Sequence, residues 1–346
     1  MRAMVLSQPG PLSERPSPLV STDVAPPVPR ANELLVRVSV CGVCRTDLDL
    51  AEGRLKAPQY PLIIGHQVVG RVVGFGEGVP AFAKGDRVGV AWIHSACGKC
   101  RWCRAGVENL CPDFQGTGCH VNGGYAEYLA VPAAFAHAIP SAFTDAAAAP
   151  LLCAGAVGWR SLRLANLLNG EPLGITGFGA SAHLELQLAR RRHPNSPVYV
   201  FARAAAEREF ARELGAQWTG DTSEAPPQPL GAIIDTTPAW KPVVEALRRL
   251  APGGRLVINA IRKEDRDAQE LLKLDYGTDL WMEREIKSVA NVTRADIREF
   301  LDAATRLDVV PTVAEVPLEH ANEALAWLRS GVAIRGARVL RVAADG

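Results

Sequence analysis

The spacing of hydrophobic positions along the chain changes near residue 155. Before that point, short apolar runs of strand type are interrupted by many Gly and Pro residues, a texture typical of an irregular, mainly β domain. The expected strands span residues 34–40, 67–73, 87–92 and 125–131.

After residue 155, short apolar runs alternate with longer amphipathic stretches. A run at 173–176 precedes a glycine turn and a helix that extends through Arg192. This alternation predicts a parallel sheet covered by helices, the doubly wound α/β arrangement. The pattern continues with strands at 198–201, 232–235 and 255–260 and helices at 204–214 and 240–250.

The C-terminal part supplies a helix at 295–307 and a strand at 338–342. A chain of 346 residues is too long for one ordinary core, so two domains are expected. We expect residues 1–155 and 295–346 to form one discontinuous domain and residues 156–294 to form the other.

The composition excludes several classes of protein. The chain has 48% hydrophobic and 22% charged residues and a formal net charge of +1, which gives no basic surface for nucleic acid. No apolar run approaches the roughly 18 residues that cross a bilayer, and the N-terminus lacks the apolar core of a signal peptide. We therefore expect a cytoplasmic protein that acts on a small molecule, with neither nucleic acid nor membrane as a partner.

Four of the eight cysteines fall within one short polar segment, expected as a lobe at about 94–114. Because a reducing compartment disfavours disulfides, metal binding is the first hypothesis. Four thiolates suit a closed, structural zinc site, although iron–sulfur clusters use overlapping spacings. The candidate ligands are Cys97, Cys100, Cys103 and Cys111.

A second set of metal-binding residue types is more dispersed. Cys41 and Cys44 are followed by His66 and, much later, by Cys153. Taken separately, the first two could be a redox pair and the histidine an ordinary polar residue. A catalytic zinc needs three nitrogen or sulfur ligands and one open position, which this set could supply.

Several motifs in the same order resemble the zinc-containing medium-chain alcohol dehydrogenases along almost the whole chain. The sequence around Trp92 and Ser95 to Gly98 is especially similar to the tetrameric bacterial branch. The motifs are Cys44-Arg45-Thr46-Asp47, Gly65-His66, the four-cysteine lobe, the stretch 123–128 and the stretch 150–155.

The resemblance implies a fold, an activity and a metal content. The fold is a Rossmann-type doubly wound parallel sheet domain beside a mainly β, GroES-like catalytic domain with a four-cysteine zinc lobe. Cys44, His66 and Cys153 would hold the catalytic zinc, with Cys41 as a structural neighbour, so that each chain carries two zinc ions. The activity is reversible hydride transfer between a primary or secondary alcohol and NAD(P)+, and the assembly a homotetramer or homodimer.

By the same resemblance, Thr46 accepts the alcohol proton and lies at the cofactor. Asp47 accepts the second ring N–H of His66 and fixes its tautomer. The plain alternatives are a turn threonine and an exposed aspartate.

The dinucleotide site is expected where Gly177, Gly179 and Ala182 follow a strand and open a helix. The glycines allow a tight turn and close approach of the pyrophosphate to the main chain. The next strand ends in Ala202-Arg203 without a carboxylate. Because arginine can pair with a 2′-phosphate, this feature favours NADP(H), with NAD(H) still possible.

Three residues depart from the usual family pattern. Gln67 follows His66 where glutamate is common. Asp49 stands where a histidine often ends the proton relay. Either Asp49 relays the proton itself, or the relay runs from Thr46 through cofactor hydroxyls to water and Asp49 is a solvated surface residue. Val157 replaces a threonine that contacts the nicotinamide amide, which would then need main-chain partners near residues 290–292.

Trp92 is expected to line an apolar substrate pocket, with Trp281 and Met282 as further contributors, from this or a neighbouring subunit. The main alternative is a zinc-free enone or quinone reductase of the same superfamily, which the three retained ligands disfavour. A zinc-lobed nucleic-acid-binding module would need a basic patch, which the near-neutral charge of this chain disfavours. A cofactor-binding protein that has lost catalysis is disfavoured because Thr46 and the three ligands are intact.

Overall fold

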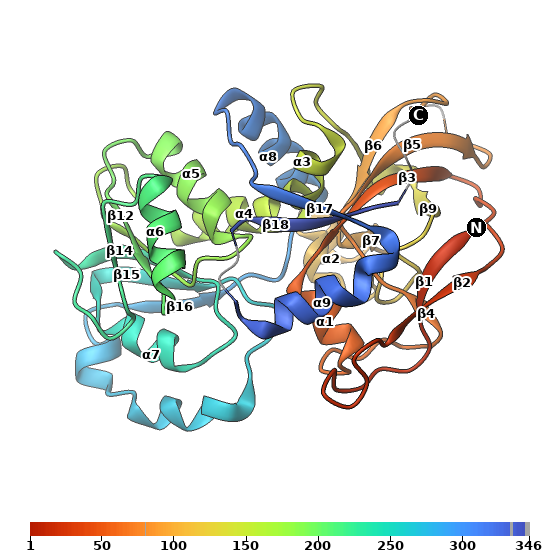
Figure 1. The fold of residues 1–346 in the computed structure, drawn as a ribbon. Coiled ribbons are helices and arrows are strands. Elements are labelled where there is room, and N and C mark those ends of the chain that lie inside the picture. Colours follow the sequence, from red (N-terminus) through yellow and green to blue (C-terminus); the bar gives the residue numbers. More distant parts are fainter. Residues whose placement is uncertain (80, 333–334, 343–346) are drawn as a thin grey trace.

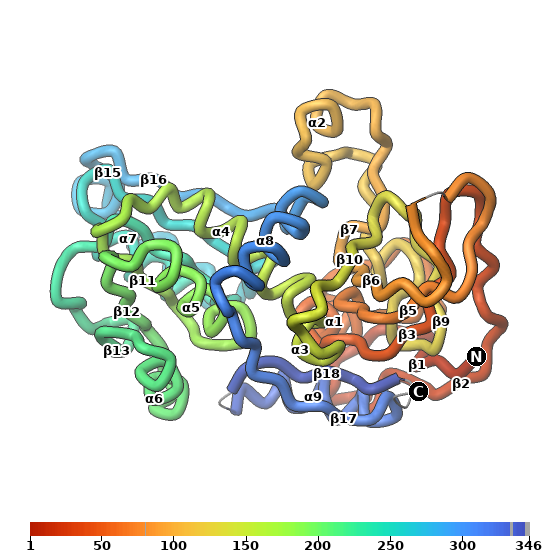
Figure 2. The backbone as a smooth tube through the Cα atoms, turned by 90° about the horizontal axis from the view of Figure 1, so that it is seen from above, coloured from red at the N-terminus to blue at the C-terminus, as the bar shows by residue number. Residues whose placement is uncertain are grey.

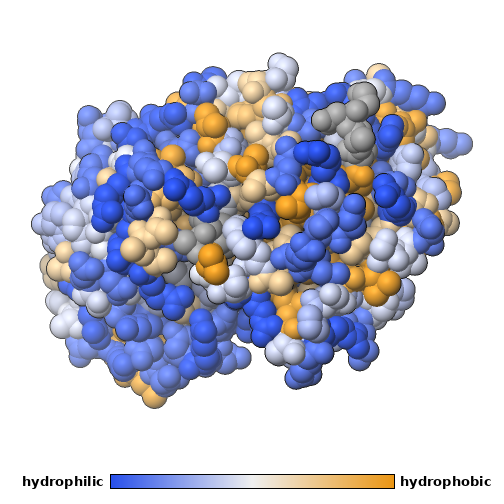
Figure 3. Space-filling model, in the orientation of Figure 1, coloured by the Kyte–Doolittle hydropathy of each residue, from blue (hydrophilic) through white to orange (hydrophobic). Residues whose placement is uncertain are grey.

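The computed structural model describes residues 1–79, 81–332 and 335–342. The chain forms two halves, one built on a parallel sheet with helices and the other rich in antiparallel strands (Figure 1). On the face drawn in Figure 3, hydrophobic side chains lie in small groups among hydrophilic ones. Within the described ranges, no helix is long and apolar enough to cross a membrane.

The β-rich half is organised around β3 (Glu33–Val43), which is longer than the predicted strand at 34–40. It pairs antiparallel with β5 (Val68–Phe75) and β9 (Tyr128–Pro132), and its alternate residues are buried, as a strand with one face on a core requires. The other strands of this half are β1 (Arg2–Leu6), β2 (Leu19–Asp23), β4 (Leu62–Ile63), β6 (Arg87–Val90), β7 (Ile93–Ser95), β8 (Gln115–Gly116) and β10 (Ala136–Ala138).

The end of the described chain lies in the same sheet. Strand β18 (Ala337–Arg341) pairs antiparallel with β3, and β17 (Val313–Pro317) pairs parallel with β18. Helix α9 (Ala321–Ser330) connects these two strands. Pairing between Cys41 and Leu340 therefore joins segments from the first and last parts of the sequence in one sheet.

The other half contains a six-stranded parallel sheet in the order β13-β12-β11-β14-β15-β16. This is the Rossmann order, and it confirms the predicted fold class. Helices α4 (Ala156–Ala165), α5 (Ala182–Arg192), α6 (Ala205–Glu213) and α7 (Lys241–Leu247) connect or flank the strands (Figure 1). The strands are β11 (Leu173–Thr176), β12 (Val198–Phe201), β13 (Trp218–Gly220), β14 (Leu230–Asp235), β15 (Leu250–Ile258) and β16 (Glu285–Ser288).

Two helical crossings connect the halves. Helix α3 (Asp145–Pro150) continues through a π-helical turn, η3 (Leu151–Gly155), into α4, and α8 (Arg294–Arg306) leads back. Phe300 of α8 packs so closely on Gly155 that a Cβ there would collide with its ring. The two crossings are therefore in direct contact.

The structure differs from the predicted elements where local pattern carries little information. The helix expected at 240–250 ends at Leu247, because Leu250 already pairs with Leu230 as the start of β15. Strand β16 was not predicted: all its residues are exposed, so it shows no apolar run. It lies at the sheet edge, where pairing with β15 alone defines it.

Candidate active site

Three residues far apart in the sequence meet in the β-rich half. Cys44 is the N-cap of α1 (Arg45–Ala51), His66 lies between β4 and β5, and Cys153 lies in η3. Their sulfur and nitrogen atoms all lie within 4.8 Å of one another, and His66 and Cys153 are buried. The predicted ligand set is thus brought together by a loop, a helix start and a helical crossing.

The electrostatics of the three groups are those of a metal-binding set. Contact with the Cys153 thiol lowers the pKa of Cys44 well below the usual thiol value, against the effect of burial. Burial alone would lower the pKa of His66, but the charges of Asp47 and Cys44 raise it to about 10. The site therefore favours negative charge on sulfur together with a cation beside it, and a metal ion can replace the proton.

The free ring nitrogen of His66 shows whether these three residues suit a metal ion. Its Nδ1 lies 3.1 Å from Asp47 Oδ1, whereas its Nε2 is buried and has no hydrogen-bond partner among the described residues. A buried imidazole nitrogen without a partner is costly. Two thiols and one imidazole with no fourth protein ligand match the donor set of a catalytic zinc.

Asp47 contacts two of the three residues. Its carboxylate accepts a hydrogen bond from the Cys44 main-chain N–H at 2.8 Å and faces Tyr125 Oη at 3.4 Å. Burial raises the pKa of Asp47, and the neighbouring His66 opposes that effect. Asp47 thus bonds the start of α1, which was not predicted, and faces the His66 ring, which was.

The remaining expected neighbours are also buried. Trp92 is 5% exposed, and its ring meets that of His66 edge to face, with centroids 5.1 Å apart. Thr46 and Gln67 are 6% and 3% exposed. The Gln67 side chain lies over Gly42, where an added Cβ would come within 2.9 Å of its Oε1.

Asp49 is not the solvated surface residue that one sequence alternative proposed. It is buried on α1, and the Arg54 Nε donates to its Oδ1 at 2.7 Å. Burial raises its pKa, and the positive charges of Arg54, Arg45 and Arg262 oppose that effect. The carboxylate is therefore already engaged in an ion pair.

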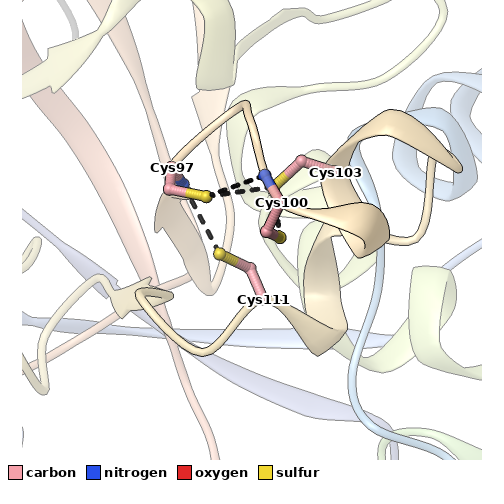
Figure 4. Close-up of side chains that lie close together, drawn as sticks. All are labelled: Cys97, Cys100, Cys103 and Cys111. Carbon is pink, nitrogen blue, oxygen red and sulfur yellow. Dashed lines mark hydrogen bonds between the residues drawn. The ribbon is translucent and has the colours of Figure 1, made fainter.

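The four-cysteine lobe converges as its spacing predicts (Figure 4). All four sulfur atoms lie within 4.8 Å of one another, and every cysteine is a free thiol. The lobe includes α2 (Arg101–Arg104) and η1 (Glu108–Leu110) and projects from the body (Figure 2). Four sulfur donors leave no open coordination position, which suits a structural zinc.

The glycine turn of the dinucleotide motif follows β11 directly. Gly177 has a φ of +78°, which a side chain would strain, and an added Cβ would lie 2.8 Å from Thr236 Oγ1. Gly179 has open space around it, and Ala182 is fully buried at the start of α5. The turn lies beside β14, at the point where the strand order reverses and where such sheets bind ligands.

The arginine that the sequence predicts to pair with a 2′-phosphate, directly after the second strand, is accessible. Arg203 is exposed just after β12, and no carboxylate stands at the strand end. Arg208 donates to the main-chain oxygens of Ala202 and Arg203 at 2.7 and 2.9 Å and so holds this turn. Val157, by contrast, is buried in α4.

Sequence reasoning missed a buried polar network beneath the glycine turn. Glu185 accepts hydrogen bonds from Ser181 at 2.9 Å and from Asn259 at 2.6 Å. Burial raises the pKa of Glu185 to about 7. Ser181 Oγ also lies 2.9 Å from the Ala154 carbonyl oxygen, so that its one hydroxyl proton is shared with Glu185, and this contact connects the turn to the segment of Cys153.

Two ion pairs, one between the halves and one within the parallel-sheet half, were also not predicted. Arg45, next to Cys44, donates to Glu264 after β15 at 2.6 Å. Lys263 pairs with the buried Asp235 at the end of β14. No local pattern marks these pairs, because the partners come from different halves or from separate strands and loops.

Comparison with known proteins gives consistent results. Residues 30–141 match the family described as Alcohol dehydrogenase GroES-like domain. The chain is 44% identical to the "Probable alcohol dehydrogenase AdhA" of Mycobacterium tuberculosis, covering 99% of this chain and 97% of that protein. It is 33% identical to an alcohol dehydrogenase of Geobacillus stearothermophilus, covering 93% and 95%. A cobalt- and zinc-bound thermostable alcohol dehydrogenase of Pyrobaculum aerophilum superposes with a TM-score of 0.85 at 27% identity, covering 99% of each chain.

The contact between Asp47 and His66 generates a prediction about metal affinity. In Asp47→Asn, the imidazole loses its charged acceptor, so the metal affinity of the Cys44, His66 and Cys153 site should fall about 10–100-fold. Zinc retained per chain against graded chelator measures this. Asp302→Asn, an exposed change on α8, serves as control, and equal retention in both variants would contradict the prediction.

The network beneath the glycine turn predicts a pH dependence of stability. Because the folded pKa of Glu185 is raised from 4.5 to about 7, folding favours its protonated form. That contribution is complete below pH 4.5 and is lost as the pH rises to about 7. Relative to wild type, Glu185→Gln should gain unfolding free energy over this range, by at most about 1.4 kcal/mol per pH unit.

Denaturant unfolding of both proteins at pH 5, 6, 7 and 8 measures the difference. Glu285→Gln is the control, because Glu285 is exposed beside Arg255 and its pKa is lowered. A constant difference between Glu185→Gln and wild type from pH 5 to 8 would mean that Glu185 is ionised throughout.

Proposed function

The chain belongs to the zinc-containing medium-chain alcohol dehydrogenases, and on that premise we propose that Cys44, His66 and Cys153 hold its catalytic zinc. It is an enzyme that transfers a hydride reversibly between an alcohol and a nicotinamide cofactor, giving an aldehyde or ketone. The observation that carries the assignment is the buried His66 Nε2, which has no partner among the described residues, on a ring that brings a nitrogen within 4.8 Å of both thiols.

The chemistry at this site divides between the metal and the chain. When bound, zinc supplies Lewis-acid polarisation, which lowers the pKa of an alcohol hydroxyl so that it loses its proton near neutral pH. Thr46, two residues after Cys44 and almost buried, would accept that proton through its hydroxyl. Trp92 packs edge to face on His66 and keeps water from that side of the imidazole.

The proton then needs a route to solvent. Asp49 is a poor relay, because its carboxylate is buried and paired with Arg54 at 2.7 Å. We therefore favour a route from Thr46 through the hydroxyl groups of the cofactor to water. The sequence alone leaves a relaying Asp49 and a non-relaying Asp49 equally open, and the ion pair with Arg54 favours the second.

The cofactor would be held at both ends by main-chain groups. The turn of Gly177, Gly179 and Ala182, followed by the N-terminus of α5, would bind the pyrophosphate. For the nicotinamide amide, Val157 offers no hydroxyl. The main-chain N–H groups of residues 290–292 donate to no acceptor within the described residues and are suitable partners.

Each chain would carry a second, structural zinc on Cys97, Cys100, Cys103 and Cys111. We propose domains at 1–155, 156–294 and 295–346, the last returning to the first, which the pairing of β18 with β3 supports. Eight free cysteines fit a reducing cytoplasm.

An assembly of two or four chains is the expected oligomeric state. The edge strand β16 leaves one side of the parallel sheet unpaired among the described residues. Trp281 and Met282 are more than half exposed beside it, which fits burial by a second copy, where they could also reach a neighbouring substrate site. Small apolar alcohols and carbonyl compounds are the proposed substrates, because Trp92 gives the site an aromatic wall and polyols need polar partners.

Metal analysis with a substrate panel tests the function. Wild type should contain two zinc ions per chain and should oxidise primary, secondary or benzylic alcohols. His66→Ala should keep one zinc and lose activity by at least about 1000-fold, because the hydroxyl is no longer polarised. One zinc or none in wild type, with reduction of enones or quinones alone, would instead indicate the zinc-free reductase.

The cofactor preference follows from Arg203. We expect wild type to have a higher kcat/KM with NADPH than with NADH. Arg203→Ala should lower kcat/KM for NADPH about 10–100-fold and leave that for NADH within about threefold, because only the 2′-phosphate loses a charged hydrogen bond. Arg212→Ala, an exposed change on α6, is the control, and a strong preference of wild type for NADH would overturn the assignment.

A further inference from the structure

The cysteine lobe forms hydrogen bonds with a segment that follows the parallel sheet. Glu108 Oε1 accepts hydrogen bonds from both the main-chain N–H and the Nε of Arg294, each at 3.0 Å. Asn109 Nδ2 donates to the Ala290 carbonyl at 2.8 Å. Both lobe residues lie in η1, between the third and fourth cysteines, so a metal on the four sulfurs would fix their position.

The contact is buried on the Glu108 side and involves three segments. Glu108 is 3% exposed. The Arg294 guanidinium also lies over the ring of Phe135, 4.7 Å from its centroid. Phe135 belongs to η2 (Ala133–Phe135), which precedes β10. Arg294, the first residue of α8, therefore connects that helix with the lobe and with the segment before β10.

The segment that the lobe contacts, residues 289–294, leads from β16 into α8. Val289 extends the parallel sheet by donating to the Ile258 carbonyl at 2.9 Å. The next three main-chain N–H groups are free among the described residues, and Asn291 has a left-handed φ of 55°. Because Asn109 occupies the Ala290 carbonyl, the lobe holds these donors in place.

Displacement of this segment would reach the catalytic ligands. Thr293 caps α8 through a reciprocal pair of hydrogen bonds with Asp296. Further along α8, Phe300 packs on Gly155, two residues from Cys153. The lobe thus contacts the segment with the free N–H groups directly and is connected through α8 to the segment of Cys153.

We propose that Glu108 and Asn109 are positioning residues, through which the cysteine lobe sets residues 290–294 for the nicotinamide end of the cofactor. This inference rests on the proposed placement of the nicotinamide amide at residues 290–292. It gives the lobe a role in hydride transfer beyond its own folding. Neither residue touches the reacting atoms.

The test compares two ligands that differ only in the nicotinamide. Glu108→Gln, Asn109→Ala and the double variant are titrated as zinc-loaded enzymes with the reduced cofactor and with the matching ADP-ribose. We expect the Kd of the reduced cofactor to rise about tenfold in the double variant and that of ADP-ribose to change less than twofold. The KM for cofactor should rise more than kcat falls.

Glu127→Gln is a matched control. Glu127 accepts hydrogen bonds from the main-chain N–H and the Nε of one arginine, Arg2, as Glu108 does from Arg294. Its contact lies within the β-rich half, so the ratio of the two Kd values should not change. Zinc content and melting temperature are recorded for every variant.

The outcomes are distinct. Equal weakening of both ligands, or loss of lobe zinc with an unchanged Kd ratio, would overturn the positioning role and leave only structural support. Asn109→Ala removes one neutral hydrogen bond, so it supplies the test if Glu108→Gln does not fold. Wild type that binds cofactor without oxidising any alcohol would contradict the proposed function, independently of the variants.

Discussion

Two thiols and one imidazole nitrogen lie together with few hydrogen-bond partners, the imidazole and one of the thiols buried, and the rest of the site is built around that constraint. Cys44, His66 and Cys153 come from three separate elements whose ligand atoms lie within 4.8 Å of one another. Burying such groups is unfavourable unless a cation satisfies them. Asp47 keeps the groups in place: its carboxylate contacts the second ring nitrogen of His66 and accepts a hydrogen bond from the main-chain N–H of Cys44.

Close main-chain packing makes this placement possible. Gly65, directly before His66, has a φ of +99°, and a Cβ there would collide with the ring of Tyr125. A Cβ on Gly118 would come within 2.7 Å of the Gly65 nitrogen. The loop that carries His66 is thus pressed between neighbouring strands and loops, and side chains at these glycines would displace the imidazole from the thiols.

The two halves are joined by polar contacts as well as by chain crossings. Arg45, beside the proposed metal ligand Cys44, pairs with Glu264 of the parallel-sheet half. Ser181 of the glycine turn bonds the carbonyl next to Cys153, and Glu108 of the lobe bonds Arg294. Because hydride transfer requires alcohol and nicotinamide to meet at short distance, contacts that fix the halves relative to each other bear directly on the reaction.

The sequence determined the features that depend on residue type and local spacing. The four-cysteine lobe, the turn at Gly177 and Gly179 and the alternating strands and helices are local patterns, and each was found where it was predicted. The proposed ligands Cys44, His66 and Cys153 were selected through resemblance, because nothing in their spacing alone indicates that they meet.

Tertiary structure decided the rest: the pairing of Asp49 with Arg54 in a buried position, the acid Glu185 under the glycine turn, the edge strand β16 and the contact between Glu108 and Arg294. These features depend on burial and on partners that only the folded chain supplies. Glu108 and Arg294 are 186 residues apart, and a separation of that length leaves no pattern in the sequence.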